Sequence, residues 1–221
     1  MKKFTTVKSL ALATAVAGAM SMPTTAAAEV SATLEIASQY IFRGLVEETG
    51  NAQVSGSLDY EHDSGVYVGV WSGSINSGVE MNYYAGFAGE IEDFSYDIGL
   101  LHYRFPGADQ QGVEEFLTEA YLELGYMGLG FGAYIGVDKV GTSRSQGDDN
   151  KDNYFTLSYE HGQFGALVGY FDADDKADEY SHLDLTYEAL PGLTFMASHI
   201  LDAEDDFVSG TQFVVAYEFS F

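Results

Sequence analysis

The 221-residue chain contains no cysteine, only three prolines and only nine basic residues. Without cysteine it has no disulfide framework, no thiolate metal site and no thiol nucleophile. The nine basic residues stand against 34 acidic ones. Because nucleic-acid binding depends on lysine and arginine to neutralise phosphates, this balance excludes nucleic acid as an expected partner.

Long hydrophobic runs are also missing. After residue 28, no stretch approaches the roughly 18 continuous apolar residues of a membrane-spanning helix. Residues 1–28 have the layout of a secretory signal, with a lysine-containing start, an apolar stretch at 10–22 and small residues at 26–28. We therefore expect a cleaved signal peptide, 1–28, and one mature domain, 29–221. Removal of the three signal lysines takes the net charge from −25 to −28.

What the mature sequence does contain is alternation with a period of two, which predicts β-strands. The predicted strands are residues 30–36, 52–60, 66–71, 79–89, 94–103, 116–126, 129–137, 154–161, 164–171, 182–188, 193–201 and 211–221. Most have the length of roughly 9 to 11 residues that a tilted strand needs to cross a membrane.

The connections between these strands alternate between short and long. The short ones lie near 62–65, 91–93, 126–128, 161–163 and 189–192, and the longer ones at 43–51, 73–78, 104–115, 138–153, 172–181 and 202–210. This layout is typical of an outer-membrane barrel with both chain ends on the periplasmic side. The predicted fold is all-β, a transmembrane antiparallel up-and-down β-barrel of about 12 strands.

Charge placement distinguishes this barrel from a soluble β-sandwich, which would also alternate. The mature basic residues all lie in or at the edge of the longer connections; they are Arg43, Arg104, Lys139, Arg144, Lys151 and Lys176. Nine strand carboxylates fall on the parity opposite the apolar residues, namely Glu35, Asp59, Glu80, Asp97, Glu119, Glu123, Glu160, Asp184 and Glu218. A water-facing sheet would normally mix both signs. We therefore expect the nine carboxylates to point into a lumen and to form an ion pathway.

Aromatic residues show two further patterns. One set lies near predicted strand ends, where interfacial girdles would require it: Tyr40, Phe42, Phe94, Phe116, Tyr126, Phe164, Tyr187 and Phe221. A second set has the inward parity and would fill part of the lumen: Tyr67, Trp71, Tyr84, Tyr103, Tyr121 and Tyr134.

Several segments resemble the TorF-type porin family of proteobacterial outer-membrane proteins. The resemblance begins at SQYIFRG, residues 38–44, and continues through 56–75, 94–107 and 116–126. It implies a small outer-membrane barrel with a channel, and it names no substrate. The alternating aromatic ending at Tyr217, Phe219 and Phe221 also resembles the signal by which such barrels are handed to the barrel assembly machinery.

Patterns that would indicate other chemistry are weak. The five histidines show no metal-ligand spacing, the acidic runs do not fit a calcium loop, and no nucleophile motif is present. The glycine-rich residues 128–136 continue the alternation, which favours strand glycines over a phosphate-binding loop. We expect no enzyme activity, no cofactor and no specific metal site.

Two functions remain as hypotheses. The first is a porin-like channel for passive diffusion of small solutes, with cation preference from its inward carboxylates. The alternative is a side-chain-filled barrel that acts as a structural or surface-interaction protein. In either case the expected partners are outer-membrane lipid and lipopolysaccharide, which the acidic loops would contact through bridging divalent cations.

Overall fold

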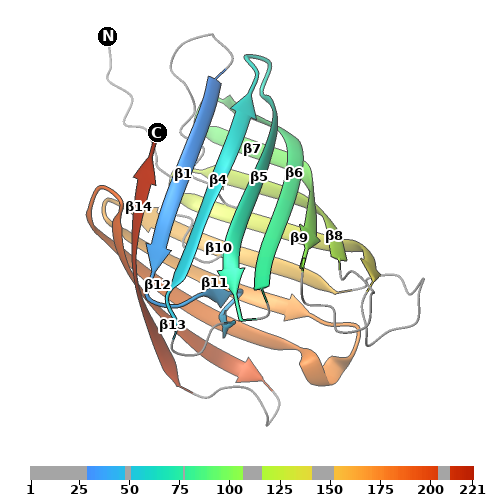
Figure 1. Ribbon diagram of the computed structural model, residues 1–221, viewed down its shortest axis with the longest axis vertical. Helices are drawn as coiled ribbons and strands as arrows, with labels where there is room; N and C mark the ends of the chain where they lie inside the picture. The colour runs from blue at the N-terminus through green and yellow to red at the C-terminus, as the bar shows by residue number, and fades with distance from the viewer. Residues whose placement is uncertain (1–28, 48–50, 77, 107–115, 141–151, 204–209) are drawn as a thin grey trace.

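The computed structural model describes residues 29–47, 51–76, 78–106, 116–140, 152–203 and 210–221, with only the backbone described at 138–140 (Figure 1). The predicted signal peptide, 1–28, lies outside these residues. So do the predicted loop cations Arg144 and Lys151 and the central parts of three predicted long connections.

Twelve antiparallel strands form one closed barrel (Figure 1). They are β1 (Glu29–Ala37), β4 (Gln53–Glu61), β5 (Val66–Ile75), β6 (Gly78–Ile91), β7 (Phe94–Arg104), β8 (Phe116–Tyr126), β9 (Leu129–Val140), β10 (Asn153–His161), β11 (Phe164–Asp172), β12 (Tyr180–Leu190), β13 (Leu193–Ala203) and β14 (Thr211–Ser220). Each pairs with its chain neighbour, and β1 closes the ring by pairing with both β4 and β14. The predicted all-β fold is confirmed. Among the described residues, no helix is both long enough and apolar enough to traverse a bilayer.

The two faces of the barrel wall have opposite polarity. On β5, Val66 and Val68 are exposed on the outside, while Tyr67 between them is buried inside. Exposed large apolar side chains occur in the same way on every strand of the barrel. Because successive side chains of a strand point to opposite faces, the period-two alternation of the sequence becomes an apolar exterior and a largely polar interior.

Tight turns connect the strands at one end of the barrel, called the turn end below. At the other end, the loop end, the connections are longer except for the one between β5 and β6. Between β8 and β9, Met127 and Gly128 both have positive φ, 51° and 87°, as a two-residue type I′ hairpin requires. One predicted loop was wrong. Residues 73–78 are mostly strand, because Ile75 pairs with Gly78 and leaves a connection of only two residues.

The first long connection contains an element that the sequence did not reveal. Its residues form a small hairpin of β2 (Ile41–Phe42) and β3 (Leu45–Val46), separate from the barrel sheet. Arg43 and Gly44 make its turn, both with positive φ, 50° and 85°. At the same end, the 3-10 helix η1 (Lys176–Asp178) lies between β11 and β12 and is capped by the side chain of Asp175.

Candidate functional site: the barrel interior

All nine predicted carboxylates lie on the inward face of their strands, because they share the parity of the buried lumen side chains. Glu80, Glu119 and Asp184 are buried. The other six are partly exposed: Glu35, Asp59, Asp97, Glu123, Glu160 and Glu218. Two pairs face each other directly across neighbouring strands, Glu35 with Glu218 and Asp97 with Glu123. The wall therefore places acidic groups on both sides of the interior.

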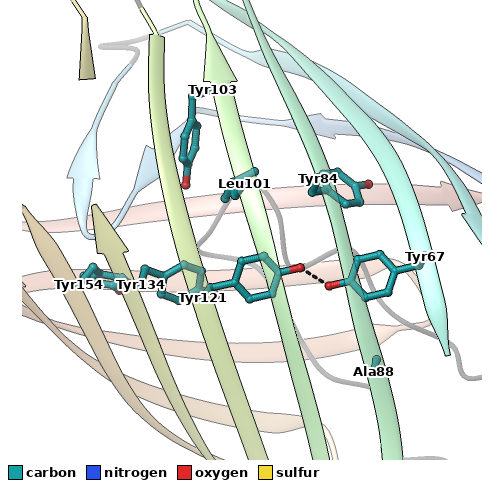
Figure 2. Close-up of a cluster of buried hydrophobic side chains, with 8 residues drawn as sticks. All are labelled: Tyr67, Tyr84, Ala88, Leu101, Tyr103, Tyr121, Tyr134 and Tyr154. Atoms are coloured by element: carbon teal, nitrogen blue, oxygen red, sulfur yellow. Dashed lines mark hydrogen bonds between the residues drawn. The ribbon is translucent and has the colours of Figure 1, made fainter. Parts of the chain in front are cut away.

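Tyrosine hydroxyls hold several of these carboxylates. Tyr67 donates a hydrogen bond of 2.6 Å to Asp97. Its hydroxyl also contacts the hydroxyl of Tyr121, as Figure 2 shows. Tyr84 donates to Asp59 in the same way, and Tyr134 to Glu123. These tyrosines belong to the predicted inward set, and that prediction is confirmed. They narrow the interior and fix the carboxylates in place.

Small residues make room for these rings. Gly99 lies opposite Tyr121 in the β7–β8 pair, and a Cβ at Gly99 would come within 2.5 Å of the Tyr121 hydroxyl. Gly86 lies in the same way opposite Tyr67. The rings therefore lie flat across the neighbouring strand instead of projecting into open space. Glycine is required there because any larger residue would meet the ring and the adjacent backbone.

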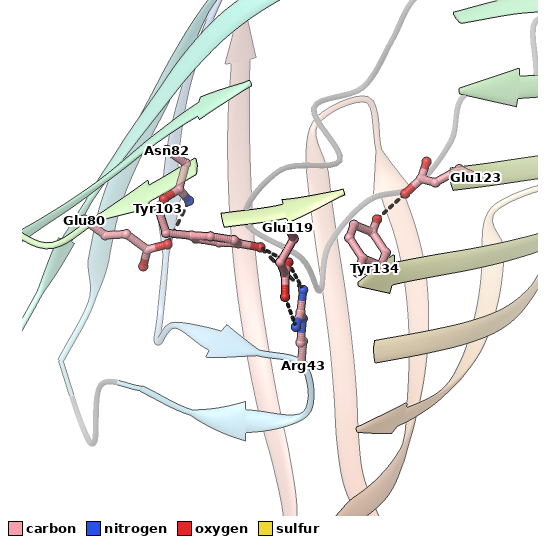
Figure 3. A network of polar contacts seen from close by, with 7 residues as sticks. All are labelled: Arg43, Glu80, Asn82, Tyr103, Glu119, Glu123 and Tyr134. Atoms are coloured by element: carbon pink, nitrogen blue, oxygen red, sulfur yellow. Dashed lines mark hydrogen bonds and ion pairs between the residues drawn. The ribbon is translucent and has the colours of Figure 1, made fainter. Parts of the chain in front are cut away.

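The interior also contains a cation. Arg43, at the tip of the β2–β3 hairpin, donates two hydrogen bonds of 2.9 and 2.6 Å to the two oxygens of Glu119 (Figure 3). Their side chains are only 2% and 1% exposed. Tyr103 donates a further bond of 3.1 Å to Glu119. Burial, the largest single cause, lowers the pKa of the Arg43 guanidinium, but Glu119, Tyr103 and Tyr154 together raise it above its usual value, so Arg43 stays charged.

Three aromatic rings surround the same guanidinium. Its central carbon lies 4.8 Å from the ring centre of Phe42, 5.3 Å from that of Tyr134 and 4.5 Å from that of Tyr154. These distances are within the range of cation–π attraction. Arg43 is thus held by a bidentate ion pair and by aromatic faces at once.

The hairpin corrects three sequence predictions. Arg43 was expected among the loop cations, but it lies inside the barrel, so the interior is not purely acidic. Tyr40 and Phe42 were expected in an interfacial girdle. Instead, Tyr40 is buried and donates a 3.2 Å hydrogen bond to Glu80, and Phe42 packs edge-on against Tyr103. The alternation of the sequence could not predict these positions. It shows which side of the wall a strand residue faces, but it does not apply to a loop that folds inward.

A buried polar chain lies beside the hairpin. The two ring nitrogens of His182 contact Tyr154 Oη at 2.8 Å and Asp184 Oδ1 at 3.2 Å. Ser198 faces Asp184 across the β12–β13 pair, but its hydroxyl has no protein hydrogen-bond partner. Since both nitrogens of His182 are engaged elsewhere, neither is placed to activate Ser198. The alternation predicted Asp184 as an inward carboxylate, but no sequence pattern linked it to His182, Tyr154 or Ser198.

The outer face carries aromatic residues near the turn end. Phe94 lies opposite Tyr126 in the β7–β8 pair, and Phe164 stacks on Tyr187 with ring centres 4.9 Å apart. All four are exposed on the exterior. Phe116, at the opposite end of β8, packs against His102 with ring centres 5.4 Å apart. These residues thus lie on the outer face near the strand ends, where an aromatic girdle would place them.

At the loop end, the described acidic residues are partly neutralised. Lys176 forms ion pairs with Asp172, at 2.7 Å, and with Glu179. Of the other predicted acidic runs, 148–150 and most of 202–206 lie outside the described residues. Within the part of the chain that the structure describes, no three His, Asp or Glu side chains are grouped as a metal site would need.

The C-terminal residue takes part in barrel closure. The backbone of Phe221 exchanges two hydrogen bonds with Ala32 of β1, at 2.9 and 3.3 Å. Phe221 is 78% exposed, and Tyr217 and Phe219 also face outward. Glu218 faces the interior between them. The structure thus joins the last residue directly to the first barrel strand.

Comparison with known proteins gives a family but no activity. Residues 21–216 match the family Gcw_chp, described as a bacterial protein of unknown function. The matched range includes nearly the whole barrel. A search of curated proteins found no match.

Proposed function

The chain belongs to the Gcw_chp family of bacterial proteins of unknown function, and from that premise we propose that it is a porin-like channel of the bacterial outer membrane. The channel conducts small solutes by passive diffusion and prefers cations. The N-terminal signal pattern supports export, and the barrel form supports insertion as a ring of tilted strands.

The observation that carries this proposal is the inverted polarity of the barrel wall. Large apolar side chains are exposed on all twelve strands, whereas Glu80, Glu119 and Asp184 are buried within. Exposed apolar patches on soluble monomers rarely exceed a few hundred Å². An apolar band on every strand is best covered by lipid, and the closed ring leaves no backbone edge unpaired in the hydrocarbon.

Cation preference follows from the charges in the interior. Nine carboxylates face inward, and one of them, Glu119, is neutralised by Arg43. Rings of Asp and Glu lower the energy of cations in a pore and raise that of anions. The resemblance of 38–44 and the following segments to TorF-type porins supports the same reading, as does the aromatic C-terminus expected of a substrate of the assembly machinery.

Reconstitution in a planar lipid bilayer tests this function. Under a potassium chloride gradient we expect conductance steps and a reversal potential of cation-selective sign. Replacing Glu35 and Glu218 with Gln should move that potential toward zero, because the pair lies on the inner wall away from the hairpin. Glu92→Gln, in an exposed tight turn, removes a charge outside the lumen and serves as the control.

An anion-selective reversal potential in the unmodified protein would overturn the carboxylate mechanism. Absence of conductance steps from folded, inserted barrels, both in the unmodified protein and in a variant whose lumen has been opened by substitution, would overturn the channel itself.

A second function is favoured by one specific observation, the filling of the interior. Six buried tyrosines and Leu101 form one packed cluster, and the β2–β3 hairpin adds further side chains. A barrel filled permanently in this way would serve as a structural or surface-interaction protein. Its acidic loops would then bridge to lipopolysaccharide through divalent cations. This function predicts that the inserted barrel shows no conductance steps in the bilayer experiment.

A further inference from the structure

We propose that residues 39–46, called the plug hairpin below, close the lumen, and that the Arg43–Glu119 ion pair is the latch that holds it closed. The inference rests on the channel function proposed above and adds a gate to it. The channel conducts fully only when the latch opens and the plug hairpin leaves the interior.

The plug hairpin crosses the barrel from wall to wall. On one side Tyr40 bonds to Glu80 of β6, and Arg43 bonds to Glu119 of β8. On the other side Ile41 packs in a cluster with residues of β13 and β14, and Gly44 lies against the ring of His182 on β12. In the closed ring, β6 and β8 lie across from β12 to β14. A segment that touches both sides occupies the cross-section between them.

The contact at Gly44 shows how closely the tip fits. A Cβ at Gly44 would lie 2.5 Å from Cγ and 2.7 Å from Cβ of His182. Arg43, the neighbouring turn residue, projects into the opposite wall, where Figure 3 shows it bonded to Glu119. The turn residues thus wedge between β8 and β12, and neither wall is open to solvent at that level because Arg43, Glu119 and His182 are all buried.

The plug hairpin can leave without damage to the barrel. Its two strands pair only with each other and form a sheet separate from the closed ring. The barrel strands on either side, β1 and β4, pair directly over nine residue pairs. Displacement of the plug hairpin therefore breaks side-chain contacts and none of the barrel ladder.

The closed state also carries costs that release would relieve. Arg43 is a non-glycine residue with φ of 50°, a backbone conformation that L-residues rarely adopt. Four buried polar atoms around the plug hairpin and the adjoining wall have no protein hydrogen-bond partner: Arg43 Nε, Asn82 Oδ1, Asp184 Oδ2 and Ser198 Oγ. Water entering behind the departing hairpin would hydrate them. In this proposal the Arg43–Glu119 ion pair offsets these costs and makes the closed state more stable than the open state.

Limited trypsin digestion of the folded protein in detergent tests the latch without relying on conductance. Trypsin cuts after Arg43 only when that residue is reachable, and Lys176, 69% exposed, reports protease activity in the same sample. We expect the wild type to resist cleavage at Arg43. In Glu119→Gln, the fragment ending at Arg43 should appear at least about tenfold faster, because Arg43 has lost its buried counter-ion.

Asp97→Asn is the matched control. It removes a carboxylate from the same interior, but Asp97 bonds to Tyr67 and not to the plug hairpin. This variant should resist cleavage at Arg43 as the wild type does. Cleavage at Arg43 in the wild type at the rate of Lys176, or equal resistance in Glu119→Gln, would overturn the latch.

The same three proteins in planar bilayers then separate the gate from the channel. We expect Glu119→Gln to show a larger or more frequent conductance step than either the wild type or Asp97→Asn. Faster cleavage with unchanged conductance would overturn the gate and leave the channel function standing. If none of the three proteins showed conductance steps although the cleavage pattern was as expected, the channel function would be overturned, and the gate with it.

Discussion

At the scale of single residues, the interior is organised by pairs of one large and one small side chain. Tyr121 lies across Gly99, and Tyr67 lies across Gly86, each ring reaching over the neighbouring strand. Their hydroxyls end close together and beside Asp97. Aromatic rings placed over strand glycines are a known means of fixing strand register. In this barrel they also set how much of the lumen remains free.

The first prediction concerns Gly99. In Gly99→Ala the new methyl group would meet the Tyr121 hydroxyl and, at 2.7 Å, the backbone oxygen of Ala85. Overpacking of this kind costs about 1–3 kcal/mol, so the free energy of unfolding should fall by that amount. Urea unfolding in detergent micelles, followed by tryptophan fluorescence, measures it.

Tyr121→Phe provides the matched background for this test. Gly99→Ala should cost less when the Tyr121 hydroxyl is already absent, because one of three close contacts is removed, while Cζ of the ring at 2.6 Å and the Ala85 oxygen at 2.7 Å remain. Equal costs in both backgrounds would show that the Tyr121 hydroxyl does not determine the space at Gly99.

At the scale of elements, the plug hairpin is the part of the fold that alternation does not describe. Its turn residues, Arg43 and Gly44, adopt positive φ so that a two-residue turn can reverse the chain inside the barrel. The residue at the tip is the one that pairs with Glu119. Local backbone conformation and long-range ion pairing therefore depend on each other.

The second prediction uses Gly44. Alanine there is disfavoured by a φ of 85°, and its methyl group would also overlap the ring of His182. We expect Gly44→Ala to displace the plug hairpin and to raise trypsin cleavage after Arg43, as Glu119→Gln does. Gly162→Ala is the control, since Gly162 also has positive φ, 64°, but a Cβ there would contact nothing within 4 Å.

The two glycine variants separate backbone strain from contact with His182. Strain alone would give both variants the same modest loss of stability, on the order of 1–2 kcal/mol, and neither would expose Arg43. Unchanged protection of Arg43 in Gly44→Ala would mean that the hairpin tolerates the overlap by local adjustment.

At the scale of the whole molecule, closure joins the first and last strands of the barrel. β14 pairs with β1 at residues such as Glu35 with Glu218, and the backbone of Phe221 extends this pairing to Ala32. Closure removes the last free sheet edge, as a membrane-spanning barrel requires because lipid offers an open edge no hydrogen-bond partner. The terminal residue thus has two separable features, its backbone bonds and its exposed ring.

The third prediction separates these features. Deletion of Phe221 should reduce the amount of folded barrel in the outer membrane several-fold, while inserted molecules keep their unit conductance. Phe221→Ala retains the backbone bonds to Ala32 and removes only the ring. If the ring is the assembly signal, both variants should insert poorly, as measured by heat-modifiable migration of membrane fractions.

Phe213→Ala is the control for loss of an exposed aromatic from the same strand, away from the terminus. Normal insertion of Phe221→Ala together with failure of the deletion would assign the effect to closure. Normal insertion of both variants would count against any assembly role for the terminal residue.

Much of the barrel could be predicted because successive residues of a strand face opposite sides of the wall. Apolar and polar residues therefore alternate along each strand, and the alternation reveals which side each residue faces. The alternation in 116–126 and 211–221 places Glu119, Glu123 and Glu218 on the inner face, where the structure has them. Turn signals at 126–128 and 161–163 likewise marked where strands reverse. Errors arose where strands ran on beyond the expected boundary, as at Ile75.

The sequence by itself determined the strand parity, the chain closure and the sign of most interior charges, since these depend on local alternation and composition. Only the tertiary structure decided that the first loop folds inward and that Arg43 meets Glu119, 76 positions away along the chain. No local pattern encodes that contact. It exists because twelve strands close into a ring, which brings β8 opposite the connection after β1 and leaves a buried carboxylate for a loop cation to pair with.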